Sequence, residues 1–170
     1  MAFFSYSTLE KKYKGFNVPQ FLIEVNGREV KLKDYPVTEL NVLMSAAYDM
    51  SSCEFVIGGI FDPKSGKFEN DVYSAFKPGS IVKVKVGYGS SLQGVFTGYI
   101  NSLSFEFDGQ RGPVITVQCL DAKGALVNNK TWKSYGKQDL KSIITKILNE
   151  KCSKYAKIEK IEYGYDRNEK

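Results

Sequence analysis

The side chains best suited to catalysis in this chain are two acidic pairs, Glu106 with Asp108 and Asp62 with Glu69. Two carboxyl groups can hydrolyse a glycosidic bond when one acts as the acid and the other as base or nucleophile. Glu106 and Asp108 stand two residues apart in a strand-like run, so they would share one face of a strand. No apolar pocket that would raise either pKa is evident nearby. We interpret the pair as a solvated strand face and keep a carboxylate-dependent hydrolase as an open alternative.

The chain contains no histidine among its 170 residues. This removes the commonest general base, the commonest metal ligand and every Ser-His or Cys-His nucleophile pair. Cys53, Cys119 and Cys152 lack the short spacing of a zinc or redox motif. Cys53 and Cys119 lie in apolar strand-like runs, which predicts buried thiols and a reducing compartment. The sequence therefore predicts no enzyme, with no catalytic, cofactor-binding or metal-binding residues and no cofactor.

Two further patterns concern charged ligands. Gly87-Tyr88-Gly89 does not connect a strand to a helix N-terminus, where backbone N–H groups would hold a phosphate, so it predicts a turn. Lys83 and Lys85, followed by Tyr88, would suit an oligonucleotide on the surface of a barrel. A small barrel that binds single-stranded nucleic acid or glycan is therefore the alternative function.

The positive charge of the chain is concentrated in its last third. Residues 1–120 carry 12 basic and 12 acidic residues, whereas residues 121–170 carry 12 basic and 7 acidic residues, which gives the net charge of +5. Tyrosines stand among these lysines at Tyr135, Tyr155, Tyr163 and Tyr165. The lysines are spaced around a helical pattern rather than clustered, so we predict a solvated helix face and no specific nucleic-acid site.

Residues 18–121 have the pattern of short antiparallel strands. Asn26-Gly27 between two strand-like runs predicts a tight hairpin, because both residue types tolerate positive φ. Further strands are predicted near residues 40–46, 53–57, 81–86 and 114–120. The run from Leu92 to Phe107 is long for one strand, and Gly94 and Gly98 within it predict bulges or bends.

At least six such strands with short polar turns predict a mainly β fold. A small closed or nearly closed antiparallel β-barrel removes most exposed strand edges, with a sandwich as the alternative. The barrel is followed by a short α/β segment with one amphipathic helix. The apolar positions of that helix are Leu140, Ile143, Ile144, Ile147 and Leu148.

Three regions follow from these patterns. Residues 1–17, with the aromatic residues Phe3, Phe4, Tyr6, Tyr13 and Phe16, are an N-terminal arm or a first strand. Residues 18–121 are the barrel. Residues 122–170 comprise a linker, the amphipathic helix and a terminal strand at residues 158–163, or the start of a further domain. The first residues lack the pattern of a signal peptide, and no apolar run approaches the roughly 20 residues that span a bilayer.

Three blocks of the barrel region resemble a known family. The blocks are Phe76–Val84 with Val86–Gly89, then Val95–Ile100, then Val114–Asp121 with Leu126. In this order and at this spacing they resemble the first domain of the late control gene D family. That family includes phage tail hubs and the VgrG-like spike proteins of type VI and extracellular contractile injection systems. The resemblance covers about residues 18–150.

The resemblance implies a structural baseplate or tail-hub protein that adapts the tail tube to the central spike. Its partners would be the tail tube protein, the spike protein and further copies of the chain. That family has two barrels per chain, whereas this sequence ends at Lys170 with room for one. A trimer, a ring of six and a monomer therefore stay open. The expected location is the virion tail or baseplate, or an injection particle, assembled in the bacterial cytoplasm without a signal peptide or membrane insertion.

Overall fold

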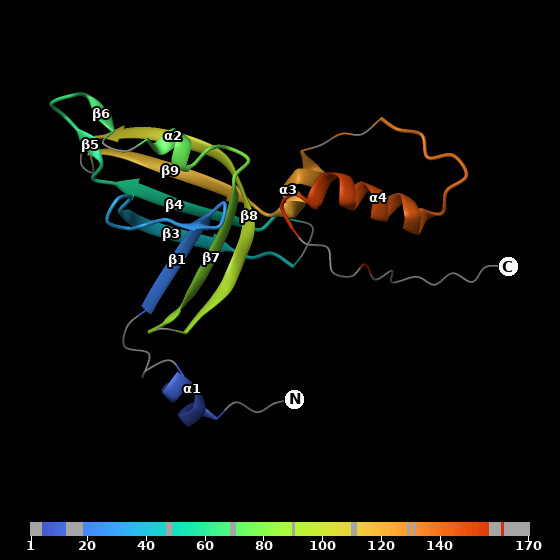
Figure 1. Cartoon of the computed structure of the whole chain (residues 1–170), viewed down its shortest axis with the longest axis horizontal. Coiled ribbons are helices and arrows are strands. Elements are labelled where there is room, and N and C mark those ends of the chain that lie inside the picture. The colour runs from blue at the N-terminus through green and yellow to red at the C-terminus, as the bar shows by residue number, and fades with distance from the viewer. Residues whose placement is uncertain are drawn as a thin grey trace.

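A computed structural model describes residues 5–12, 19–46, 49–68, 71–89, 91–109, 112–128, 130, 132–156 and 161. A strongly curved antiparallel sheet forms the larger part of the molecule (Figure 1). The helices α3 (Ala122–Val127) and α4 (Leu140–Cys152) form a smaller part at one end of that sheet. This division places the change from strands to helices at Asp121, directly before the predicted segment 122–170 begins.

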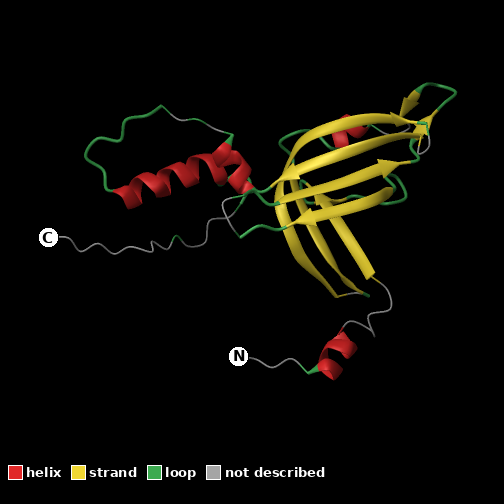
Figure 2. Ribbon diagram, turned by 180° about the vertical axis from the view of Figure 1, so that it is seen from behind, coloured by secondary structure: helices red, strands yellow, loops and turns green. Residues whose placement is uncertain are grey.

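Seven strands form the sheet, in the order β2-β1-β7-β8-β9-β4-β3. Their bounds are β1 (Pro19–Val25), β2 (Arg28–Glu29), β3 (Val37–Leu43), β4 (Ser52–Gly58), β7 (Ile81–Tyr88), β8 (Ser91–Asp108) and β9 (Gly112–Leu120). The sheet bends round on itself (Figure 2), yet within the described residues no ladder joins β3 to β1 or β2. The predicted mainly β fold with an amphipathic helix is confirmed, and the sheet is open rather than closed into a barrel.

The sheet is open between β1 and β3. The short strand β2 pairs with β1 at Glu24 and Val25, on the side where β3 would have to pair to close a barrel. The connecting turn is the predicted hairpin, with φ of 50° at Asn26 and 77° at Gly27. The Asn26 carboxamide oxygen accepts a hydrogen bond from the Ile81 amide at 2.9 Å, which fixes the turn against β7.

The long strand β8 produces much of the curvature. It pairs with β7 along its first half and with β9 along its second half. The register shifts beside Gly94, where Val95 is the extra residue, and again at Asn101. Such bulges bend a strand and increase its twist, so the predicted bend near Gly94 is confirmed. Gly98 has a different role, because a Cβ there would collide with the Leu120 carbonyl oxygen of β9.

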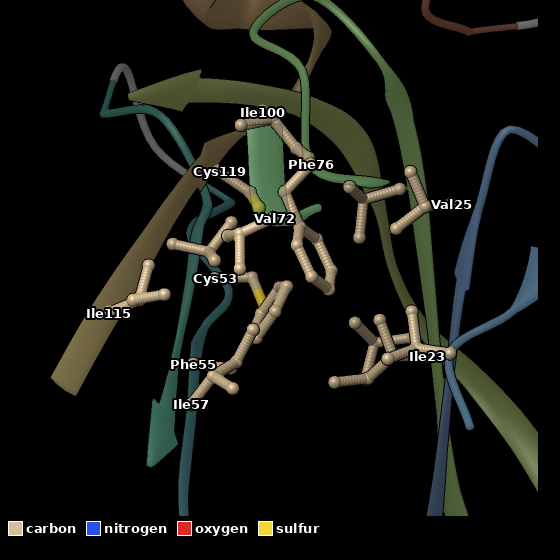
Figure 3. Close-up of a cluster of buried hydrophobic side chains, with 14 of the residues drawn as sticks. Ile23, Val25, Cys53, Phe55, Ile57, Val72, Phe76, Ile100, Ile115 and Cys119 are labelled. Carbon is tan, nitrogen blue, oxygen red and sulfur yellow. The ribbon is translucent and has the colours of Figure 1, made fainter. Parts of the chain in front are cut away.

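The core fills the concave side of the sheet. Figure 3 shows side chains from β1, β4, β9 and α2 (Val72–Ala75) directed into one interior. Phe76, just after α2, packs edge-on against Phe55 at 5.7 Å and against Tyr35 at 5.1 Å between ring centroids. Because aromatic rings contribute large apolar areas, this contact fixes α2 against the inner face of the sheet.

The predicted buried thiols are confirmed. Cys53 of β4 and Cys119 of β9 are direct cross-strand partners in the core. A hydrogen bond with Cys53 and burial together raise the pKa of the Cys119 thiol, so both sulfurs act as apolar core atoms. Cys152 of α4 is also buried, and its thiol donates a long contact of 3.6 Å to the Ala122 carbonyl oxygen.

The predicted helix is confirmed as α4, with Asp139 as its N-cap. The Asp139 carboxylate accepts hydrogen bonds from the Ser142 amide at 2.9 Å and from the Ser142 hydroxyl at 2.6 Å. Among the described residues no helix is long and apolar enough to span a bilayer. The strand predicted at residues 158–163 falls outside the described residues, apart from Ile161, which is not in a strand.

The N-terminal region shows a helix where a first strand was one alternative. Residues 6–12 form α1 (Tyr6–Lys12), which buries none of its side chains. Of the aromatic residues noted in this region, Phe3, Phe4, Tyr13 and Phe16 lie outside the described residues. The role of residues 1–17 as an arm stays a prediction.

Candidate interaction surfaces

Five aromatic rings form an exposed cluster where β8 ends, a surface that we name the aromatic end. Its members are Phe61 of β5 (Phe61–Asp62), Phe68 of β6 (Lys67–Phe68), Tyr73 of α2, and Phe105 and Phe107 of β8. Each ring lies 5.3–5.7 Å from the next between centroids, in edge-on, tilted or stacked geometry. Phe68 and Phe105 pack against the core, whereas Phe107 is 67% exposed and Tyr73 is 66% exposed.

Short-range hydrogen bonds fix this aromatic end in place. Asp62 accepts bonds from the amides of Lys64 at 2.9 Å and Ser65 at 3.2 Å, which shape the β5–β6 turn. Asp71 caps α2 by accepting bonds from the Ser74 amide at 3.0 Å and the Ser74 hydroxyl at 2.6 Å. Hydrogen bonds from Ser65 and from Ser74, respectively, lower the pKa of Asp62 and of Asp71, so both stay ionised at neutral pH. Asp62 is therefore a turn-forming residue.

A second exposed apolar group lies at the opposite end of the molecule, in and beside the connection between α3 and α4 (Figure 1). Val127 is 62% exposed, Leu140 is 70% exposed, and Trp132, the only tryptophan, is 95% exposed. Residues 121–156 carry eight lysines and three acidic residues, a net charge of +5. We name this segment, residues 121–156, the basic end.

Contacts with the sheet and with the segment after β3 hold α3 and the residues just beyond α4 in place. Gly124 of α3 leaves room for Leu120 and for the Tyr99 hydroxyl, since a Cβ there would lie 3.0 Å from each. The Tyr99 ring lies 4.3 Å from the Tyr155 ring just beyond α4, measured between centroids. The Lys123 ammonium donates to the Ser45 carbonyl oxygen at 2.8 Å, which ties α3 to the segment after β3.

The connection that carries Trp132 is held more loosely. Its neighbour Lys133 donates to the two carboxylate oxygens of Glu150 at 2.8 and 3.0 Å. This hydrogen-bonded pair lowers the pKa of Glu150 and raises that of Lys133, but both groups are solvated, so the pair contributes little stability. The Tyr135 hydroxyl is buried without a hydrogen-bond partner among the described residues.

The structure does not bring together the predicted ligand-binding residues. Lys83 lies on the outer face of β7, in an open groove against Lys154 and Tyr155 that follow α4. Lys85 shares that face, but its ammonium is paired with Glu24 at 2.7 Å. Tyr88 instead lines a separate apolar groove with Pro19, Gln20, Phe21, Leu40, Val86 and Gly87. The proposed oligonucleotide site at Lys83, Lys85 and Tyr88 is therefore not a single surface.

The remaining sequence candidates show no assembled catalytic site in the described part of the chain. Glu106 is exposed on β8, while nothing is described of the Asp108 side chain or of Glu69. Gly89 lies in the predicted turn with φ of 58°, whereas Gly87 lies within β7 and pairs with Leu92. Of the tyrosines predicted on the basic segment, Tyr135 and Tyr155 are described, and Tyr163 and Tyr165 lie outside the described residues. Within the described residues no three His, Cys, Asp or Glu side chains are grouped to hold a metal ion.

Sequence reasoning missed both exposed ends, although each left a signal. Phe105-Glu106-Phe107 alternates in a strand, and Phe61 and Phe68 flank the turn residues 63–66 at equal short distances in the sequence. A single tryptophan in the polar connection before the amphipathic helix was the signal for the basic end. Large apolar side chains in polar segments indicate contact surfaces when folding leaves them uncovered.

Comparison with known proteins supplies a family and a fold. Residues 16–166 match the family model described as the Alg8 N-terminal domain. The structure is similar to the crystal structure of the tail protein from Neisseria meningitidis MC58, with 15% sequence identity and a TM-score of 0.50. The similarity covers 81% of this chain and 35% of that protein, so the chain spans about a third of its length. No curated protein sequence matches the chain.

These matches correct one expectation. The resemblance to the late control gene D family is wrong as a family assignment, because the family model that matches is that of the Alg8 N-terminal domain. The three sequence blocks on which the resemblance was based are strand and turn patterns of β7, β8 and β9. Such patterns occur in many curved antiparallel sheets, so they indicate the type of fold but do not identify the family.

Proposed function

The chain belongs to the family of the Alg8 N-terminal domain. From its fold, and not from that family, we propose that it is a structural subunit of a tail assembly, which connects a tail tube to a central spike. The observation that carries this proposal is the fold shared with a tail protein over 81% of the chain. The partners in this proposal are the tube protein, the spike protein and further copies of the chain. The assembly is the tail or baseplate of a virion, or an injection particle, formed in the bacterial cytoplasm.

The distribution of side chains supports a binding role without catalysis. The core is continuous and apolar from β1 to β9, so the sheet can act as a stable body that presents surfaces to other subunits. Large apolar residues are exposed at the aromatic end and the basic end, as they are at Leu32, Leu43 and Met44. Of these, the rings of the aromatic end form a contiguous cluster, and contiguous exposed apolar patches mark sites of protein–protein contact. The proposed role requires no catalytic group, cofactor or metal.

The proposal is tested by co-sedimentation of the chain with assembled tail tubes, and separately with the spike protein, that are encoded nearest to it. We expect saturable binding that weakens as salt is raised, because the basic end carries most of the excess charge. A single-stranded oligonucleotide at the same salt concentrations serves as the competing ligand. Binding of the oligonucleotide with no binding of tube or spike would overturn the structural role in favour of a ligand-binding module.

A further inference from the structure

We propose that Cys53 of β4 and Cys119 of β9 form a reversible disulfide bond, which cross-links the two strands when the chain folds in an oxidising environment. This covalent modification goes beyond the proposed function and does not depend on a tail assembly. In the structure described above both thiols are free. The register of the two strands, the burial of both thiols and the separate position of Cys152 carry the assignment.

The first observation is the register of the ladder between β4 and β9. Cys53 and Cys119 are direct cross-strand partners. The Asp121 amide donates a backbone hydrogen bond of 3.0 Å to the Ser51 carbonyl oxygen, which extends the same ladder by one position. Since hydrogen-bonded positions alternate in an antiparallel ladder, Cys53 and Cys119 occupy one of them, where Cα atoms lie about 5.5 Å apart. A disulfide spans Cα separations of roughly 4.4–6.8 Å, so the backbone holds the two residues at a suitable distance.

The second observation is that both side chains enter the same interior. Cys53 and Cys119 are each 1% exposed, and Figure 3 shows both among the core side chains. A hydrogen bond with Cys53 is the first cause of the raised pKa of the Cys119 thiol, and burial is the second. The two thiols are therefore neighbours, and a bond between them requires no change of strand partner.

The third observation is the position of Cys152. This residue lies in α4, where its Sγ contacts the Ala122 carbonyl oxygen at 3.6 Å. It is not part of the core cluster that contains Cys53 and Cys119. Along the chain, however, Cys152 is nearer to Cys119 than Cys53 is. Because a shorter loop closes at a lower entropic cost, the fold selects a pair that proximity along the chain does not favour.

The reaction is a thiol–disulfide exchange with a small-molecule disulfide such as oxidised glutathione. The thiolate of one cysteine attacks a glutathione sulfur, releases one reduced glutathione and leaves a mixed disulfide on the protein. The thiolate of the other cysteine then attacks the protein sulfur of that mixed disulfide and releases the second reduced glutathione. Two protein thiols are thereby oxidised, one glutathione disulfide is reduced to two thiols, and the two cysteine protons pass to glutathione. Burial protects the pair in the folded protein, so the exchange takes place while the chain folds.

The bond would tie β4 to β9 and close a loop that contains β5 to β8. A cross-link lowers the entropy of the unfolded chain and thus stabilises the fold, provided that the native geometry accepts it. We therefore expect the oxidised sheet to resist urea better than the reduced sheet. Glutathione and thioredoxin keep thiols reduced in the cytosol, so the cross-link belongs to the chain outside such a compartment.

The test uses the full chain, reduced and unfolded in urea and then refolded by dilution into a mixture of oxidised and reduced glutathione. Free thiols are alkylated, and peptide mapping by mass spectrometry identifies the linked residues. We expect Cys53 joined to Cys119, with Cys152 alkylated. The midpoint of urea denaturation should rise in the oxidised protein and return to the reduced value when dithiothreitol is added.

Two controls separate the fold from the chemistry of the thiols. Cys152→Ala retains the proposed pair and should oxidise as the wild-type chain does, whereas Cys119→Ala should leave Cys53 and Cys152 unlinked. When the wild-type chain is oxidised without removal of the urea, the Cys119–Cys152 link should predominate, because it closes the shorter loop.

A link to Cys152 after refolding, or cysteines that end as free thiols or glutathione adducts, would overturn the proposal. A Cys53–Cys119 bond that lowers the midpoint of urea denaturation would overturn it as well, because the native register would then not accommodate the bond. The mapping is performed on the wild-type chain, so it decides the question even if Cys119→Ala does not fold. None of these outcomes bears on binding of the tail tube or the spike, which the co-sedimentation experiment measures on its own.

Discussion

The curved sheet and the α3–α4 part of the molecule differ in how completely they bury their apolar side chains. In the sheet, residues such as Phe55, Ile57 and Val117 are completely buried, because strands face each other across a closed interior. In α4 only Cys152 is buried, although five apolar residues share one helical face. The sheet is therefore stable by its own packing, whereas the helical part keeps apolar surface available for another molecule.

This difference also predicts where the molecule opens first. The strands of the sheet pair along their length and bury their side chains in a common core. At the C-terminal end of α4, Cys152 contacts Ala122, and Tyr155 just beyond the helix packs against Tyr99. Segments with few buried contacts open at a low free energy, far below that of global unfolding. The α3–α4 connection should thus open at a lower free energy than the sheet.

The largest effect is expected from a pair of side-chain truncations, one in each region. Phe55→Ala removes a buried ring that packs against Phe76, and we expect it to lower the free energy of unfolding by about 3–5 kcal/mol. Trp132→Ala removes the most exposed ring and should change that free energy by less than about 0.5 kcal/mol. Urea denaturation followed by circular dichroism measures both. Similar losses for the two variants would contradict the contrast.

A second pair of variants tests the packing of β8 against β9. Gly98→Ala places a methyl group against the Leu120 carbonyl oxygen, whereas Gly94→Ala meets nothing within 4 Å. We expect a loss of about 1–3 kcal/mol for the first variant, because the strands must move apart, and little change for the second. The midpoint of urea denaturation reports both. Equal stability of the two variants would show that the close approach at Gly98 is not required.

Thiol labelling compares the stabilities of the two regions directly. Burial raises the pKa of Cys152, and a hydrogen bond with Cys53 together with burial raises that of Cys119, so neither is reactive while folded. Because α4 opens more easily than the sheet, we expect one thiol to react with a disulfide reagent well before the other two. A Cys152→Ser variant should lose that early phase alone. An early phase that persists in this variant would place the weak region in the sheet.

The smallest effect is expected at the cap of α4. Hydrogen bonds from Ser142 lower the pKa of Asp139, so its stabilisation of the helix is present above the ordinary carboxyl pKa, about 4, and is lost as pH falls through its lower folded value. We expect a small loss of helical circular dichroism on acidification. Asp139→Asn retains the cap without the charge and should remove this part of the pH dependence, whereas Asp139→Ala should lower helicity at neutral pH. An unchanged acid response in the Asn variant would assign it to other groups.

Most individual elements could be predicted because their signals are local. Asn26-Gly27 has the backbone freedom that a tight hairpin needs, and the spacing of Leu140, Ile143 and Ile147 follows the period of a helix. The period of two in β7 already places Lys83 and Lys85 on one face and Tyr88 on the other. Combining these three residues into one site was an error that the sequence itself could have prevented.

The candidate surfaces could not be predicted in the same way. The rings of the aromatic end come from residues 61 to 107, and only the packing of the β5–β6 hairpin and α2 beside the end of β8 brings them together. Whether the sheet closes depends on pairing between β1 and β3, the long strands nearest its two edges, and no ladder joins them in the described part of the chain. Neither outcome is encoded within a short window of sequence.

The sequence by itself thus determined a mainly β chain, its hairpin turns, its buried thiols and the amphipathic helix, because each depends on neighbouring residues. The tertiary structure decided that the sheet stays open, that Lys85 is neutralised by Glu24, and that Trp132 and Phe107 face solvent. The physical reason is that burial and charge pairing depend on what lies across space from a side chain, and that partner is often distant in the sequence.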